Sequence, residues 1–303
     1  MPLENAAECK PITTKIMKAS FTDYLKSTPF YFLPHHLISA VVFKVARIKW
    51  APVKNFTLKI YLSLHEVNMS EAVEENPYAY ETLNAFFTRA LKADARIIDN
   101  SEKTMVCPVD GKVSQAQAIE NGRVFQAKGQ DYSLLELVGG IDKLAEPFTN
   151  ASFATIYLSP RDYHRIHMPL DGKLTDMVYV PGRLFSVAPH TVNTVPRLFA
   201  RNERLVCKFE TDHGPMIMIL VGAVNVSAID TVWAGSVTPP SKRKVIHTTY
   251  ENVDINLKKG LEMGRFNLGS TVVLLMNDKV TLDDAIKHDE VVTLGQKLAS
   301  YNI

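Results

Sequence analysis

The feature that most constrains the fold is a series of short apolar, β-branched segments that fill the chain after about residue 100. They follow one another without regular helical periods between them, at residues 106–113, 153–158, 177–180, 206–210, 216–221, 224–233 and 272–276. Successive strands without intervening helices favour an antiparallel sheet over a parallel, doubly wound one. Residues 211–215, with Gly214 and Pro215, have the composition of a hairpin turn. The sequence therefore predicts a β-rich domain over residues 101–303.

Residues 1–100 have a helical pattern instead. Helical spacing of apolar residues begins near residue 13 and continues through residues 34–50, 52–67 and 82–91. The segment 34–50 is interrupted by Lys44 and Arg47, whereas a membrane span needs about 20 apolar residues in a row. Two interpretations are equally open: an amphipathic helix in a membrane interface, and a helical hairpin packed on the β body. The predicted class is α+β, with N-terminal amphipathic helices followed by a mainly antiparallel sheet. A last short helix is predicted after Thr281, because residues 281–284 resemble a capping box.

Charge is spread unevenly along the chain. Residues 1–60 hold nine Lys and Arg against three Asp and Glu, a net +6, so a chain of net charge +2 leaves about −4 for the rest. A basic segment indicates an anionic partner, either nucleic acid or acidic lipid. Phe30, Tyr31, Phe32 and Trp50 border the basic residues and suit a membrane interface, so we expect an anionic membrane surface and no nucleic acid.

The three cysteines predict no special chemistry. Cys9, Cys107 and Cys207 have neither disulfide-framework nor metal-ligand spacing, which indicates a reducing compartment. Cys107 and Cys207 lie in apolar surroundings and are expected in the core.

Residues 158–169 are dense in reactive side chains. His164 and His167 are three positions apart, but no Glu stands between them and no third ligand is evident, so no metal site is predicted. A hydroxyl, an imidazole and a carboxylate could instead form a charge relay, with Ser270, one of the two histidines and Asp110 as candidates. Asp162 is expected to anchor its own loop.

The segment Leu268-Gly269-Ser270-Thr271 alone has the pattern of a turn before a buried strand. Together with Tyr157-Leu158-Ser159-Pro160-Arg161-Asp162-Tyr163-His164-Arg165-Ile166-His167-Met168-Pro169, it resembles the phosphatidylserine decarboxylases of the bacterial, membrane-associated type, which depend on a pyruvoyl group. Further stretches that fit the same family, in the same order, lie at residues 84–89, 96–99, 108–111, 126–129, 180–187, 198–204 and 231–235.

The resemblance implies a proenzyme that cuts itself between Gly269 and Ser270. The products would be a large chain, residues 1–269, and a small chain, residues 270–303, whose first residue becomes a covalent pyruvoyl cofactor. Ser270 would be the nucleophile, with His167 and Asp110 completing the relay. The substrate amine would then form an imine with the pyruvoyl group, and His164 would orient the carboxylate or serve in the protonation.

The same resemblance implies decarboxylation of phosphatidylserine to phosphatidylethanolamine and carbon dioxide. It also implies a homodimer, and a peripheral location on the cytoplasmic face of the cell's inner membrane. Two alternatives stay open from the residues: a membrane-associated serine hydrolase that uses Ser270, His167 and Asp110, and a non-catalytic membrane-binding module.

Overall fold

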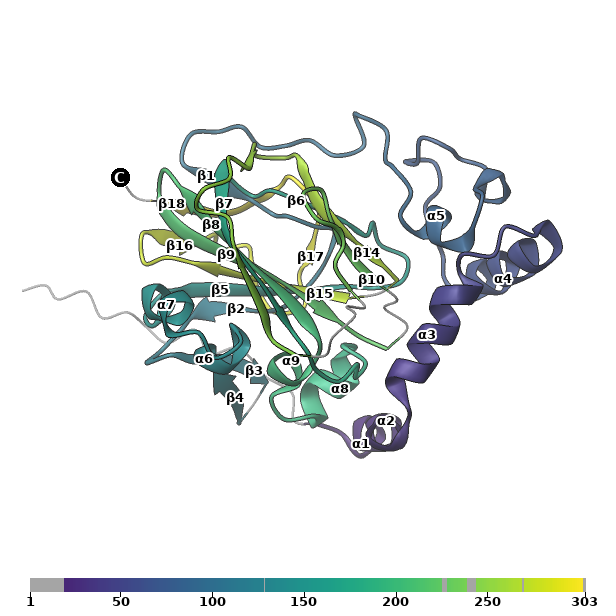
Figure 1. Ribbon diagram of the computed structural model, residues 1–303, viewed down its shortest axis with the longest axis horizontal. Coiled ribbons are helices and arrows are strands. Elements are labelled where there is room, and N and C mark those ends of the chain that lie inside the picture. Colours follow the sequence, from purple (N-terminus) through teal and green to yellow (C-terminus); the bar gives the residue numbers. More distant parts are fainter. Residues whose placement is uncertain (1–18, 128, 225–227, 239–243, 269, 302–303) are drawn as a thin grey trace, which may run out of the picture.

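A computed structural model describes residues 19–127, 129–224, 228–238, 244–268 and 270–301 (Figure 1). The helical elements are α1 Phe21–Ser27, α2 Pro29–Phe32, α3 His35–Val45, α4 Ala51–Leu64, η1 Pro77–Ala79, α5 Leu83–Phe87, α6 Leu134–Leu137, α7 Asp142–Ala145, η2 Glu146–Phe148, α8 Pro189–Thr194 and α9 Leu198–Arg201. The first strands are β1 Thr104–Val106, β2 Gly111–Ala118, β3 Arg123–Ala127, β4 Gln130–Ser133, β5 Ser152–Leu158, β6 Arg165–His167, β7 Gly172–Val180, β8 Arg204–Thr211 and β9 Gly214–Gly222. The remaining strands are β10 Ala228–Thr231, β11 Gly235–Ser236, β12 Ile246–Thr249, β13 Asn256–Leu257, β14 Glu262–Asn267, β15 Ser270–Met276, β16 Val280–Leu282, β17 Val291–Val292 and β18 Lys297–Tyr301.

The body is built on a nine-stranded sheet in the order β12-β7-β8-β9-β15-β5-β2-β17, with β13 paired to β7. A four-stranded sheet, β11-β10-β14-β6, a three-stranded sheet, β1-β18-β16, and the β3-β4 hairpin complete it. The pairings between these strands are antiparallel. The predicted α+β class with a mainly antiparallel sheet is confirmed.

Strand β15 lies inside the large sheet, between β5 and β9 (Figure 1). Each of its residues from Ser270 to Met276 is buried, so both of its faces are covered. A strand covered on both faces favours a continuous apolar run, and the sequence supplies one from Val272 to Met276. The predicted segment 272–276 is therefore a central strand that begins two residues earlier.

Helices α1 to α5 form a helical arm along one side of the body (Figure 1). Helix α1 begins at a capping box in which the Ser20 side chain accepts from the backbone of Asp23, and Ser27 Oγ donates to the backbone oxygen of His190 on α8 at 3.1 Å. Helix α3 buries Ser39 while Val41 is 53% exposed. This helix therefore packs on the body, as the second interpretation predicts, and also presents apolar side chains to solvent; its place in a membrane interface stays a prediction.

The structure corrects two of the predicted helices and does not describe the start of a third. The helix predicted after Thr281 is absent from residues 270–301: the pattern lies at β16, and the Asp283 carboxylate accepts from the backbone of Ala285 in a turn. Helix α5 covers Leu83–Phe87, only part of the predicted 82–91. Residues 13–18 lie outside the described part of the chain. Cys107 and Cys207 are fully buried, as expected.

Candidate active site

Ser270 is the first residue of the central strand. Its cross-strand partners are Leu158, the last residue of β5, and Gly222, the last residue of β9. The residue is 0% exposed, and its Oγ has no hydrogen-bond partner among the described residues. A buried hydroxyl without a partner is costly, by about 1–3 kcal/mol, and Thr155 and Thr271 bury others on β5 and β15. Gly269 lies outside the described residues.

Asp110 immediately precedes β2 and lies at the same end of the sheet as Ser270. Lys112 pairs with Tyr157, and a Cβ on Gly111 would lie 2.4 Å from the Tyr157 backbone oxygen, so only glycine fits there. Because β2 and β15 flank β5, two strand spacings put the backbone of Asp110 and Ser270 on the order of 10 Å apart.

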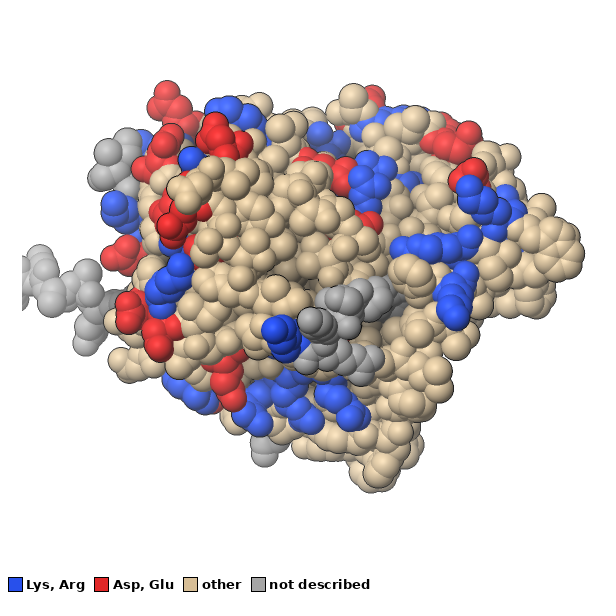
Figure 2. All heavy atoms as spheres, viewed as in Figure 1, with Lys and Arg blue, Asp and Glu red and all other residues tan. Residues whose placement is uncertain are grey.

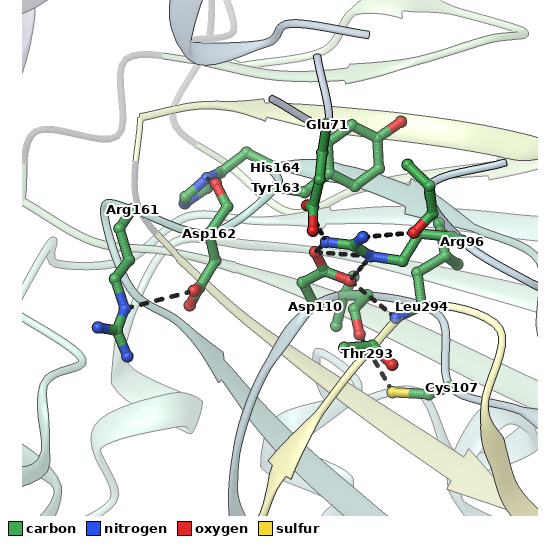
Figure 3. A network of polar contacts seen from close by, with 12 residues as sticks. Glu71, Arg96, Cys107, Asp110, Arg161, Asp162, Tyr163, His164, Thr293 and Leu294 are labelled. Carbon is green, nitrogen blue, oxygen red and sulfur yellow. Dashed lines mark hydrogen bonds and ion pairs between the residues drawn. The ribbon is translucent and has the colours of Figure 1, made fainter. Parts of the chain in front are cut away.

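The Asp110 carboxylate is held by Arg96, to which the sequence alone assigned no role (Figure 3). Arg96 donates from Nε at 2.9 and 3.1 Å and from its terminal nitrogen at 2.5 Å, while the backbone N–H of Leu294 donates at 2.8 Å. Glu71 accepts from the same guanidinium at 2.9 Å. The hydrogen bond to Asp110, opposed by burial and aided by Glu71, raises the pKa of Arg96 above its usual range. Asp110 is thus fixed in orientation and charge-balanced.

The loop that joins β5 to β6 carries the first histidine. Asp162 anchors this loop, as expected, by accepting from the Ser159 backbone at 2.7 Å. His164 is fully buried, and its Nδ1 lies 2.9 Å from the Asp162 backbone oxygen. Since a carbonyl oxygen only accepts, Nδ1 carries the proton and Nε2 presents a lone pair with no partner among the described residues.

Burial dominates the protonation of His164. Burial lowers its pKa to about 3, with the hydrogen bond to Asp162 opposing the shift and the charge of Arg89 adding to it. The ring of Phe87, on α5, lies 4.0 Å from the imidazole centroid and contributes to this apolar cover. His164 is therefore neutral at physiological pH and keeps a buried, unprotonated Nε2.

His167, at the end of β6, is in a more polar place. Its Nδ1 lies 2.8 Å from the Gly260 backbone oxygen and its Nε2 lies 3.1 Å from the Tyr163 hydroxyl. By the same reasoning Nδ1 carries the proton and Nε2 accepts from Tyr163. Burial lowers the pKa of His167, opposed by the hydrogen bond to Gly260 and by the charges of Glu262 and, more weakly, Asp110. The backbone N–H of His167 also donates to Pro108, two residues before Asp110.

The predicted residues thus gather at one end of the sheet without a closed relay. Among the described residues, no hydrogen bond joins Asp110 to His167 or either histidine to Ser270. Arg96, Tyr163 and Phe87 lie in stretches that fit the family, but sequence reasoning gave them no role, because their contacts arise only when distant segments fold together. Within the described residues, no cluster of three or more His, Cys, Asp and Glu could hold a metal ion.

Comparison with known proteins identifies the family of the chain. A family model described as phosphatidylserine decarboxylase matches residues 83–300, and a second, described as PSD, matches residues 25–61. The chain belongs to the phosphatidylserine decarboxylase family. As a member it is a decarboxylase, and the non-catalytic alternative is set aside.

The curated relatives are similar over most of their length. A phosphatidylserine decarboxylase proenzyme from Alkalilimnicola ehrlichii is 52% identical over 262 residues, 86% of this chain and 91% of the relative. The proenzyme from Bordetella pertussis is 53% identical over 262 residues, 86% and 88% of the two chains. The proenzyme from Pseudomonas entomophila is 52% identical over 273 residues, 89% and 95%.

In this decarboxylase, the Arg96–Asp110 pair should contribute far more to stability than a surface pair. The two side chains are 16% and 9% exposed, whereas Arg123 and Asp131 are each 49% exposed. Arg96→Gln leaves Asp110 nearly buried without its cation and should lower the free energy of unfolding by about 2–4 kcal/mol. Arg123→Gln, the matched control, should cost under about 1 kcal/mol in the same urea titration. Equal small losses would show that Asp110 does not depend on Arg96.

Proposed function

We propose that this protein cuts itself between Gly269 and Ser270 and then decarboxylates phosphatidylserine to phosphatidylethanolamine and carbon dioxide. The observation that carries the proposal is the Ser270 hydroxyl, fully buried and unpartnered among the described residues at the head of a central strand. Thr155 and Thr271 also bury hydroxyls without a partner among the described residues, so what supports the proposal is the place of Ser270, directly after the bond at which the family resemblance implies cleavage. Family membership supports the same reaction.

In the proposed cleavage, Ser270 Oγ attacks the carbonyl carbon of Gly269. A carbon–oxygen bond forms, the carbon–nitrogen bond of the peptide breaks, and the hydroxyl proton passes through an imidazole to the released amine. Loss of the α-proton of residue 270 then expels the Gly269 carboxylate and leaves dehydroalanine. Water converts this residue to a pyruvoyl group with release of ammonia. Each step needs a base that is neutral near pH 7, which burial of both histidines favours.

We assign the cleavage to His167 with Asp110 and the lipid reaction to His164. His167 and Asp110 lie on backbone segments joined by the hydrogen bond to Pro108, and the carboxylate charge acts on the imidazole. Nε2 of His167 already accepts from Tyr163, so in this assignment it exchanges that donor for Ser270. His164 keeps an open lone pair at Nε2, suited to orienting the substrate or moving a proton there.

The surroundings of Ser270 fit a pyruvoyl group at its position. As the first residue of the small chain, a pyruvoyl group would act as an electron sink. It would accept the electron pair that is released when the bond between the substrate's α-carbon and its carboxylate breaks. The residues around it are apolar: Leu158 is fully buried beside Ser270, and Phe87 covers His164. Exclusion of water from the substrate carboxylate would also favour loss of carbon dioxide.

We further propose that the helical arm docks on an anionic membrane at the cytoplasmic face of the inner membrane, as a homodimer. Of the 22 exposed large apolar side chains in the described part of the chain, twelve lie in residues 21–64, including Phe21 at 82% and Phe32 at 84% exposure. Figure 2 shows the ends of this arm, over α1 and α2 and over α4, as largely uncharged, with Lys and Arg nearby. No described helix has the length and apolar character needed to cross a bilayer. Apolar side chains with flanking cations suit an interfacial helix.

Self-cleavage is tested by the mass of the purified chain under denaturing conditions. We expect two chains, residues 1–269 and 270–303, with the smaller one blocked at its start and reactive towards ketone reagents. Ser270→Ala should leave one intact chain of 33.9 kDa without activity. Thr155→Val removes another buried, unpartnered hydroxyl from the neighbouring strand β5 and should not prevent cleavage. An intact 33.9 kDa chain in an active preparation would exclude the pyruvoyl mechanism. If that intact chain reacted with a fluorophosphonate, the serine hydrolase alternative would hold instead.

The assignment of the two histidines is tested by separating cleavage from turnover. His167→Ala and Asp110→Ala should remain uncut, because the nucleophile loses its base. His164→Ala should be cut yet decarboxylate at least about a hundredfold more slowly, as for loss of a proton-transfer group. His288→Ala is the control for both steps, because this imidazole lies near the surface against the Ser114 backbone oxygen and Asp289. Near-normal turnover by a cut His164→Ala chain would reverse the assignment.

Membrane docking is tested with two matched apolar positions. Phe32 and Ile97 are each 84% exposed, but only Phe32 belongs to the helical arm. Phe32→Ser should weaken binding to vesicles that contain phosphatidylglycerol by about tenfold, since burying such a side chain is worth about 1.5–3 kcal/mol. Ile97→Ser should bind as the unmodified protein does in the same sedimentation assay. Equal affinities for both variants would place the membrane contact elsewhere.

A further inference from the structure

The residue two positions before Ser270 has an unusual backbone. Leu268 has φ of 86°, in the left-handed region that a side chain with a Cβ disfavours. Such a conformation persists only where the surroundings impose it. Leu268 lies between β14 and β15, next to the bond proposed to be cut, so whatever holds it also affects the geometry of that bond.

The side chain of Leu268 is held by the helical arm. It is 7% exposed and forms an apolar cluster with Ala46, at the end of α3, and Phe87, on α5. The partly buried residues that pack on this cluster come from the same N-terminal region: Val42, Tyr61 and Leu83. The cluster therefore joins the arm to the turn that enters the central strand.

Polar contacts hold the preceding residue from the same direction. Asn84, on α5, donates to Asn267 Oδ1 at 2.8 Å, and Asn267 donates to Asp230 Oδ2 at 2.9 Å. The backbone N–H of Asn84 donates to the Ala46 backbone oxygen at 2.9 Å, which ties α5 to the end of α3. Two consecutive residues, Asn267 and Leu268, are thus fixed by one short helix.

The arm also contacts the histidine loop, residues 159–164 between β5 and β6. Phe87 lies against the His164 ring, and the Tyr61 hydroxyl on α4 donates to the Pro160 backbone oxygen. Arg89 donates to the Arg161 backbone oxygen at 3.2 Å. The same helices therefore set the position of the turn before Ser270 relative to the loop that carries His164.

We propose that helices α3 to α5 are part of the self-cleavage apparatus, and that Leu268 is a positioning residue through which they hold the bond before Ser270 in a reactive geometry. This inference rests on the proposed self-cleavage. It gives α3 two faces with different tasks: Val42 and Ala46 face the turn, while Leu37 and Val41 are exposed and available to a membrane. Apolar packing on the inner face would then control the rate of maturation.

Two adjacent valines on α3 provide a matched test. Val42 packs on the cluster around Leu268, whereas Val41 is 53% exposed. Each is changed to Ala in the full chain, which is made by cell-free translation with labelled methionine and chased. The rate of conversion of the intact chain into two chains is followed on denaturing gels. Val42→Ala should slow cleavage by about threefold to tenfold, the effect of removing two packed methyl groups, and Val41→Ala should stay within about twofold.

A second pair of variants separates positioning from folding. Leu268→Ala should slow cleavage by at least about tenfold, and Leu268→Met, which keeps the volume, should restore most of the rate. Each change is also made with Ser270→Ala, so that thermal unfolding compares uncut chains only. Slow cleavage by a chain that unfolds at the same temperature as its parent supports positioning. Loss of rate only in parallel with loss of the folded state overturns it.

The outcomes distinguish the inference from the function on which it rests. An unmodified chain that remains whole overturns the proposed self-cleavage and the inference with it. An unmodified chain that is cut, together with Val42→Ala and Leu268→Ala chains cut at the same rate, overturns the inference alone.

Discussion

The pairing of β15 between β5 and β9 is the constraint on which the rest of the site depends. All seven residues of β15 are paired on both sides and buried. A shift of one residue would turn every apolar side chain to the opposite face and break two ladders at once, so the register is strongly fixed. That register places Ser270 level with the last residues of β5 and β9, where the histidine loop begins. The position of Ser270 is thus a consequence of core packing rather than of a flexible loop.

The strands could be predicted because each has a local sequence pattern. The order in which they pair in the sheet could not. Val272 to Met276 and the segment 153–158 are apolar and β-branched, which predicts buried strands, and these two pair with each other. No local pattern states which strands meet. The helix predicted after Thr281 failed for a related reason: an Asp that accepts from the backbone two residues later serves a turn as well as a helix start. Pairing with β18 decided in favour of the strand.

The residues of the candidate site also fall into two groups: those to which the sequence assigned a role and those to which it did not. Asp110, His164, His167 and Ser270 could be selected from the sequence because their chemistry and the family resemblance single them out, and their individual roles stay predictions. Arg96 and Phe87 lie in stretches that fit the family, but no role could be assigned to them, because an arginine 14 residues before Asp110 and an apolar helix residue have no distinctive local chemistry. Their importance arises from tertiary contacts: one fixes the Asp110 carboxylate, and the other lies against the His164 ring.

The helical arm also bears on the chemistry, because it supplies part of the apolar cover that keeps His164 neutral. Burial is the largest cause of the lowered pKa of His164, and Phe87 of the arm lies on its ring. Removing that cover would let water reach the imidazole and raise its pKa back towards its ordinary value of 6.5. A chain without the arm would therefore differ in the protonation of a site residue as well as in its apolar surface. The exposed apolar surface of the arm and the burial of His164 therefore depend on the same few helices.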